Sequence, residues 1–169
     1  MLAPTKPVRY VINTHHHADH AGGLRAFVAE GIPIVTHETH ERYYQQQIFR
    51  NPHTLNPDRL AKSGKSATFE TVTGMHVLTD GKRRIEVHAF AGSGHNDAFA
   101  LVYLPAEKSA IEIDAYAPPA AGAPIPTPPN PFAVNLDDNI IRLKLNVDRI
   151  VPLHGRVGTR AELRKVIGR

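Results

Sequence analysis

The chain of 169 residues is long enough for one domain with its own hydrophobic core, and its 41% hydrophobic and 21% charged residues exclude a disordered or fibrous protein. It contains no cysteine, which excludes disulfides, thiolate metal ligands and thiol nucleophiles. The formal net charge of +4 is spread along the chain and gives little support for a nucleic-acid partner. No apolar run is long enough to span a membrane or resembles a secretory signal, so the localisation is left open.

The first half of the chain alternates short strands with helices. The apolar run at 8–13 predicts a buried strand that leads into a loop at 14–23. Apolar spacing and a glycine stop predict a helix over 22–30, followed by a strand at 32–35 and a second helix at 38–49. This alternation indicates an α/β layer with parallel strands.

After residue 50 the pattern changes. Residues 51–66 are typical of a loop with at most one helical turn. Apolar runs on either side of the turn signal Asp80-Gly81, and the runs that follow them, predict an antiparallel meander. Its strands are expected at 75–78, 84–90, 99–104 and 110–113.

The last third contains a proline-rich segment. Residues 117–132 hold seven of the fourteen prolines, which excludes a helix or a central strand there. The helical period returns at 136–147, followed by a strand at 149–153. A last helix is expected from Thr159, whose Thr-x-x-Glu spacing to Glu162 is a capping box.

Eleven histidines make metal binding the first functional hypothesis, and four ligand-type residues follow the first strand. His15 and His17 lie two apart in an extended segment, so their imidazoles project to the same side and can share one ion. Asp19 and His20 are offset from that pair and suit a second ion. Each pair needs further ligands from elsewhere in the chain.

Three later residues stand at strand ends and are candidates for those ligands. His95 lies in a glycine-rich loop after the strand at 84–90, whereas Asp114 and His154 each end a strand. Ligands at the ends of successive strands meet at one edge of a sheet, where α/β proteins build sites. Taken singly, His95 and His154 could equally be capping or core residues, and the alternative for Asp114 is an aspartate that caps a turn at the end of its strand.

Together these residues resemble the metallo-β-lactamase superfamily, whose H-x-H-x-D-H signature is matched by residues 15–20. The later order of His, Asp and His matches as well, although related sequences usually have glycine where this chain has Ile113. The resemblance implies an αββα sandwich with a two-metal site along one edge of its sheets. It implies that one metal is held by His15, His17 and His95, that the other is held by Asp19, His20 and His154, and that Asp114 bridges them.

The resemblance also implies a dinuclear-metal hydrolase in which a metal-bound hydroxide attacks the substrate. Asp19 would orient the hydroxide and pass a proton. Two zinc ions per chain are expected, and iron or manganese fits the same ligands. The expected substrate is a small molecule with an ester, lactone or thioester bond.

Other functions are weighed against this one. The absence of cysteine excludes one lactamase subclass, and a bridging Asp114 argues against the lactamases in general. The motif is close to that of hydroxyacylglutathione hydrolases, but their glutathione-binding helical region has no counterpart after His154. A phosphodiesterase or nuclease of the same superfamily and a non-catalytic metal-binding module remain as alternatives. Nucleic acid is disfavoured because the chain has no inserted basic module.

The remaining histidines are expected to have structural roles. His16 should point away from the metals and support a ligand. His37 and His40 lie three apart at a helix start and could form a further metal pair, but they are predicted to be a helix cap and a surface residue. Ordinary positions are expected for His53 in a loop and for His76 and His88 in strands.

In the family several strands normally precede the ligand loop, whereas only seven residues precede Val8 here. The sequence therefore predicts a single domain over 1–169 that is an N-terminally short sandwich. Either the chain is a fragment, or its open sheet pairs with another copy in a homo-oligomer. The proline-rich loop 117–132 should leave from the rim of the site, as a stiff flap or as a plain connection.

Overall fold

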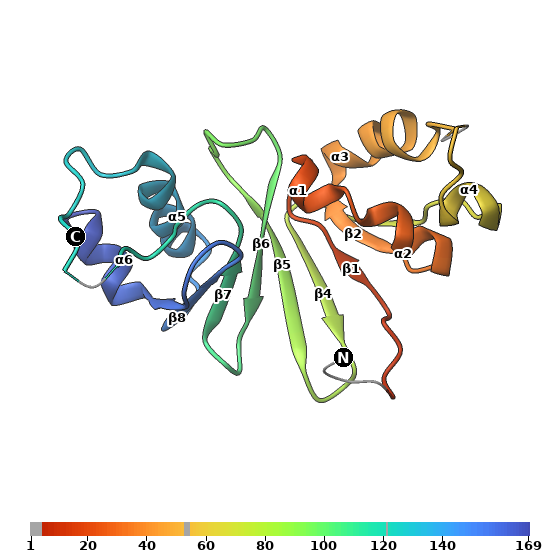
Figure 1. The fold of residues 1–169 in the computed structure, drawn as a ribbon. Coiled ribbons are helices and arrows are strands. Elements are labelled where there is room, and N and C mark those ends of the chain that lie inside the picture. Colours follow the sequence, from red (N-terminus) through yellow and green to blue (C-terminus); the bar gives the residue numbers. More distant parts are fainter. Residues whose placement is uncertain (1–4, 53–54, 121) are drawn as a thin grey trace. The chain divides into compact units, whose positions relative to one another are not determined.

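The computed structural model describes residues 5–52, 55–120 and 122–169, and the chain divides into two compact units, Met1–Thr73 and Gly74–Arg169. Within the described residues each unit has its own sheet and its own hydrophobic core (Figure 1). The expectation of one domain over 1–169 stays a prediction. In the described part of the chain no helix is long and apolar enough to cross a membrane.

The first unit contains a three-stranded parallel sheet. Its strands, in order across the sheet, are β1 (Val11–Ile12), β2 (Ile34–His37) and β3 (Phe69–Val72). The predicted α/β layer with parallel strands is confirmed, but the strand expected at 8–13 is only two residues long. Val8 and Tyr10 are exposed, so little apolar burial favours extending β1 toward the N-terminus.

Helices of the first unit connect these strands. They are α1 (Ala18–Ala21), α2 (Leu24–Glu30), α3 (Glu38–Tyr43), the π-helical η1 (Tyr44–Phe49) and α4 (Arg59–Ser63). The predicted helix at 38–49 is present as α3 continued by η1. The prediction of a loop over 14–23 was wrong at α1, because the His17 carbonyl accepts hydrogen bonds from the amides of His20, at 3.0 Å, and Ala21, at 2.8 Å, and so closes one turn.

The second unit contains a six-stranded sheet. Its strands, in order, are β4 (Met75–Thr79), β5 (Arg84–Phe90), β6 (Phe99–Leu104), β7 (Ser109–Glu112), β8 (Arg149–Pro152) and β9 (Gly158–Thr159). The antiparallel meander from β4 to β7 is confirmed, and Gly81 takes φ +88° in its first turn. Strand β8 then pairs parallel to β7 after a crossover.

Two helices of the second unit cover its core, α5 (Pro131–Arg142) and α6 (Arg160–Val166), which lie beside β7 and β8 in Figure 1. The capping box of Thr159 and Glu162 is present at the start of α6. The exclusion of helix over 117–132 was wrong at its end, because Pro131 opens α5. Proline is tolerated in the first helical turn, where its missing N–H leaves no bond unmade.

Candidate metal centre

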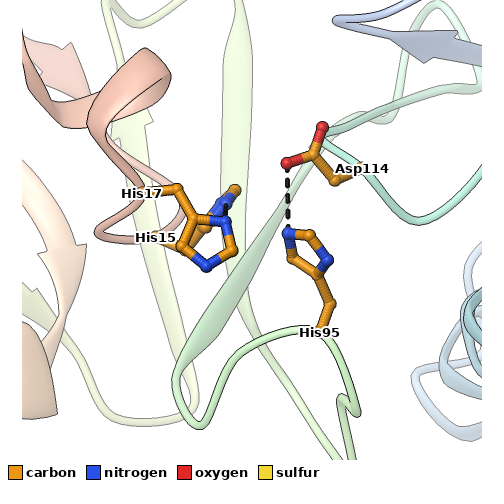
Figure 2. A group of neighbouring side chains, drawn as sticks. All are labelled: His15, His17, His95 and Asp114. Carbon is orange, nitrogen blue, oxygen red and sulfur yellow. Dashed lines mark hydrogen bonds and ion pairs between the residues drawn. The ribbon is translucent and has the colours of Figure 1, made fainter.

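Four predicted ligands lie between β1 and α2 in the first unit. His15 Nε2 is 3.1 Å from His17 Nδ1, and Figure 2 shows the two rings with these nitrogens facing each other. His20 Nε2 is 3.1 Å from Asp19 Oδ2. The structure therefore brings together both pairs that the sequence predicts within this loop.

The two pairs differ in their surroundings. His15 is fully buried, and its second ring nitrogen, Nδ1, lies 3.2 Å from the Thr14 hydroxyl, which fixes the direction of the ring. His17 stands at the N-cap of α1 in extended conformation, with φ −60° and ψ 147°. The Asp19 side chain is 62% exposed. The His15 ring is therefore held in a buried position, whereas the Asp19 carboxylate is accessible from solvent.

The second unit brings its three candidates together around Asp114. One carboxylate oxygen, Oδ2, is 3.1 Å from His95 Nε2, as Figure 2 shows, and the other, Oδ1, is 3.4 Å from His154 Nε2. Asp114 has φ +67° in the turn that follows β7. A carboxylate that offers a different oxygen to each of two histidines has the geometry expected of a bridging ligand.

Glu112 supports the turn that carries Asp114. Its side chain is fully buried, and Oε2 accepts hydrogen bonds from the amides of Ala115, at 2.8 Å, and Tyr116, at 3.2 Å. Burial raises the pKa of this carboxyl to about 7. Sequence reasoning missed Glu112, although an acidic residue inside the apolar strand 110–113 is a signal of a buried polar role.

The His95 loop is supported by helix α5. Asn139 Oδ1 accepts from the Ala91 amide at 2.8 Å, and Asn139 Nδ2 donates to the Ala91 carbonyl at 2.9 Å. The Asn139 side chain thus continues the backbone pairing of β5 beyond its last residue. Ser93 Oγ then accepts from the His95 amide at 3.3 Å. Sequence reasoning also missed Asn139, whose position on the apolar face of the helix, three residues after Leu136, was the available signal.

These donor atoms fit zinc. Two ligand atoms on a tetrahedral zinc ion, each about 2.0–2.1 Å from the metal, lie roughly 3.3–3.4 Å from each other. The four contacts within the units are 3.1, 3.1, 3.1 and 3.4 Å, and all join imidazole nitrogens to one another or to carboxylate oxygens. The chain therefore carries candidate His/Asp metal-binding groups in both units.

Comparison with known families identifies the kind of protein. A sequence model described as the metallo-beta-lactamase superfamily matches residues 3–160. The chain belongs to the metallo-β-lactamase superfamily. A comparison with curated proteins gave no match.

Solved structures of this superfamily share the fold. A metallo-β-lactamase from Pontibacter korlensis is 23% identical, with a TM-score of 0.64, over 99% of this chain and 72% of its own. An archaeal superfamily protein from Sulfolobus tokodaii is 15% identical, with a TM-score of 0.67, over 99% of this chain and 70% of its own. A rubredoxin oxygen:oxidoreductase from Desulfovibrio gigas is 17% identical, with a TM-score of 0.66, over 99% of this chain and 46% of its own. The chain thus has the metallo-β-lactamase fold, with sheets and helices consistent with an αββα sandwich.

Histidines outside the superfamily ligand positions have the following surroundings. His16 Nδ1 lies 3.3 Å from His40 Nε2, and His37 caps α3 by accepting from the Thr39 amide at 3.3 Å. The prediction that His40 lies on the surface was wrong, because its ring packs against Tyr44 and is only 2% exposed. His88 contacts Glu86 at 2.8 Å. His53 lies outside the described residues.

Proposed function

We propose that this protein is a dinuclear metal hydrolase acting on ester, lactone or thioester bonds of small molecules. The observation that supports the proposal most is Asp114, which presents one oxygen to His95 and the other to His154. In the proposed centre His15, His17 and His95 would hold one ion, Asp19, His20 and His154 would hold the other, and Asp114 would contribute a ligand to both. Membership of a superfamily that consists mostly of metal-dependent hydrolases supports the same activity.

In the proposed reaction the histidines bind metal, and Asp19 handles the attacking water. Divalent ions held by these residues would supply a Lewis acid for the carbonyl oxygen and would lower the pKa of water toward neutrality. The proposed role of Asp19 is to orient the attacking water and to take up its proton, for which its exposed carboxylate is accessible. His15 and His17, held between β1 and α1, keep their donor atoms 3.1 Å apart for a common ion.

We propose zinc because nitrogen and oxygen donors at these spacings match its preferred ligands. Iron fits the same donors, and manganese is a further candidate. The fold shared with a rubredoxin oxygen:oxidoreductase favours an oxygen-consuming iron protein as the second candidate function. The two candidates make different demands, since hydrolysis needs only Lewis acidity whereas oxygen reduction needs electrons.

The test compares metal-free, zinc-loaded and iron-loaded protein on a panel of aryl esters, lactones, thioesters and bis-aryl phosphates. We expect hydrolysis of a carboxylic substrate by the zinc form, its loss on chelation and its recovery on reloading. His17→Ala should lose this activity, whereas His37→Ala, which removes a helix cap that is not among the predicted ligands, should retain it.

Three results would contradict the proposal. Cleavage of bis-aryl phosphates alone would indicate the phosphodiesterase alternative. Two bound zinc ions without hydrolysis of any panel member would indicate a non-catalytic module. Oxygen consumption by the iron form, with an inactive zinc form, would indicate the oxidoreductase.

A further inference from the structure

We infer that Asn13 is a positioning residue for both ligand pairs of the first unit, acting through the backbone of the loop that carries them. The inference rests on the proposed function, because it assigns to Asn13 an effect on metal affinity. Asn13 itself offers no atom to a metal in this arrangement. It follows β1 directly and its side chain is only 3% exposed.

The side-chain amide of Asn13 contacts the loop at both of its ends. Nδ2 donates to the His15 carbonyl at 3.0 Å and approaches the His20 carbonyl at 3.4 Å. These two carbonyls belong to the first residue of the first ligand pair and the last residue of the second. One NH2 group therefore spans the segment that holds all four ligands, and a shift of Asn13 would move both pairs.

The orientation of the amide is fixed from the other side. Asn13 Oδ1 accepts from the hydroxyl of Tyr44 and lies 3.4 Å from Thr36 Oγ1, and both of these residues are fully buried. Carbonyl oxygens only accept and an amide NH2 only donates, so exchange of the Asn13 oxygen and nitrogen would break this set of bonds. The Asn13 backbone is also held, because its amide donates to the Val35 carbonyl of β2 at 2.9 Å.

Substitutions at Asn13 should therefore change the loop in distinct ways. Asn13→Ala removes the donor and leaves a space beside the buried His15 carbonyl and the part-buried His20 carbonyl. Asn13→Asp keeps the shape but places a carboxylate oxygen against those carbonyls, where like partial charges repel. Metal sites require donor atoms placed within a few tenths of an ångström, so both variants should bind zinc more weakly.

The experiment measures zinc affinity of the full chain by competition with a chromogenic chelator, together with the visible spectrum of the cobalt(II) form. We expect Asn13→Ala and Asn13→Asp to bind zinc roughly 10- to 100-fold more weakly, as is typical when a residue that orients metal ligands is lost. Tyr44→Phe should weaken binding less. The double variant Asn13→Ala/Tyr44→Phe should be no weaker than Asn13→Ala alone, because Tyr44 acts through Asn13.

Val28→Ala is the matched control. Val28 is 1% exposed in the same hydrophobic core as Tyr44, so its truncation lowers stability without touching the polar contacts of the loop. We expect this variant to melt at a lower temperature and to bind zinc like the wild type. Equal zinc affinities and cobalt spectra for Asn13→Ala and wild type would overturn the inference alone. A wild-type protein that binds no zinc would overturn the proposed function together with the inference.

Discussion

Asp114 contacts two histidines, and each contact uses a different carboxylate oxygen. Oδ2 faces His95 and Oδ1 faces His154. This arrangement uses both acceptors of one side chain, so it depends on a carboxylate rather than on polarity at this position. An asparagine side chain in its place could offer a metal only its single carbonyl oxygen. In the proposed centre, a carboxylate at this position would allow one residue to contact both ions.

We predict that Asp114→Asn loses one of two zinc ions, or binds it at least roughly 10-fold more weakly, because a bridging oxygen is replaced by an amide nitrogen. Metal content after dialysis against a weak chelator measures this. Asp148→Asn, at an exposed aspartate paired with Lys108 at 3.4 Å, is the control and should keep both ions. Retention of two tightly bound ions by Asp114→Asn would refute a bridging role.

A second residue-scale prediction concerns Glu112. Glu112→Ala should lower the free energy of unfolding by about 2–3 kcal/mol, since the buried amides of Ala115 and Tyr116 lose their acceptor. Glu112→Gln keeps a carbonyl oxygen for both amides and should cost less than half as much. Urea denaturation of the metal-free proteins measures the difference, and equal losses for the two variants would show that these hydrogen bonds do not stabilise the turn.

At the residue scale, the ligand types could be predicted but their supports could not. His15, His17, Asp19 and His20 stand together in the sequence, so local spacing was sufficient to pair them. The support from Asn13 depends on Thr36 and Tyr44, which are distant in the sequence. His40 was misplaced for the same reason, because helical spacing alone does not show the neighbours that bury it.

At the scale of elements, helix α5 performs two functions in the second unit. Its apolar side packs into the core, and Asn139 from the same side pairs with the backbone of Ala91 before the His95 loop. Arg142 Nη2 donates to Asn139 Oδ1 at 2.8 Å and fixes the orientation of that amide. The helix thereby connects core packing to the position of a predicted ligand.

We predict that Asn139→Ala lowers the free energy of unfolding by about 1–3 kcal/mol, because the Ala91 amide loses its acceptor and the Ala91 carbonyl loses one of its two donors. Asn135→Ala is the matched comparison. Asn135 donates only to the Ala91 carbonyl, at 3.0 Å, and that carbonyl keeps its bond from Asn139. Thermal unfolding of both variants measures the difference. Equal losses of unfolding free energy would contradict the prediction that the two bonds of Asn139 to Ala91 stabilise the protein more than the single bond of Asn135.

Helices and strands with regular apolar patterns could be predicted from the sequence, whereas the residues at which they begin and end depended on particular contacts. Alternating apolar runs and Asp80-Gly81 were enough for the β4–β7 meander. Asn130-Pro131 was an available signal for the start of α5 that the sequence reasoning missed, because asparagine caps helices and proline suits the first helical position. The sequence did not show that the His17 carbonyl would close the turn of α1. The proline-rich segment is contacted by Arg156, which donates to the Pro119 carbonyl at 3.2 Å, and its role as a flap stays a prediction.

At the scale of the whole molecule, self-association remains a prediction. Strand β1 is the outer strand of its sheet in the described residues, and exposed Val8 and Tyr10 precede it. Pairing with a second copy would cover such an edge. Light scattering at micromolar concentration should give at least twice the 18.6 kDa mass of the chain, and a monodisperse monomer would contradict this expectation.

The central proposal is that the predicted His and Asp ligands would bind two zinc ions for hydrolysis. Metal analysis of protein purified without chelator or metal-affinity steps tests it most directly, since neither ligand replacement nor a chosen substrate is needed. We predict two zinc ions per chain and no oxygen consumption. Less than one metal ion per chain, or iron together with oxygen consumption, would contradict it.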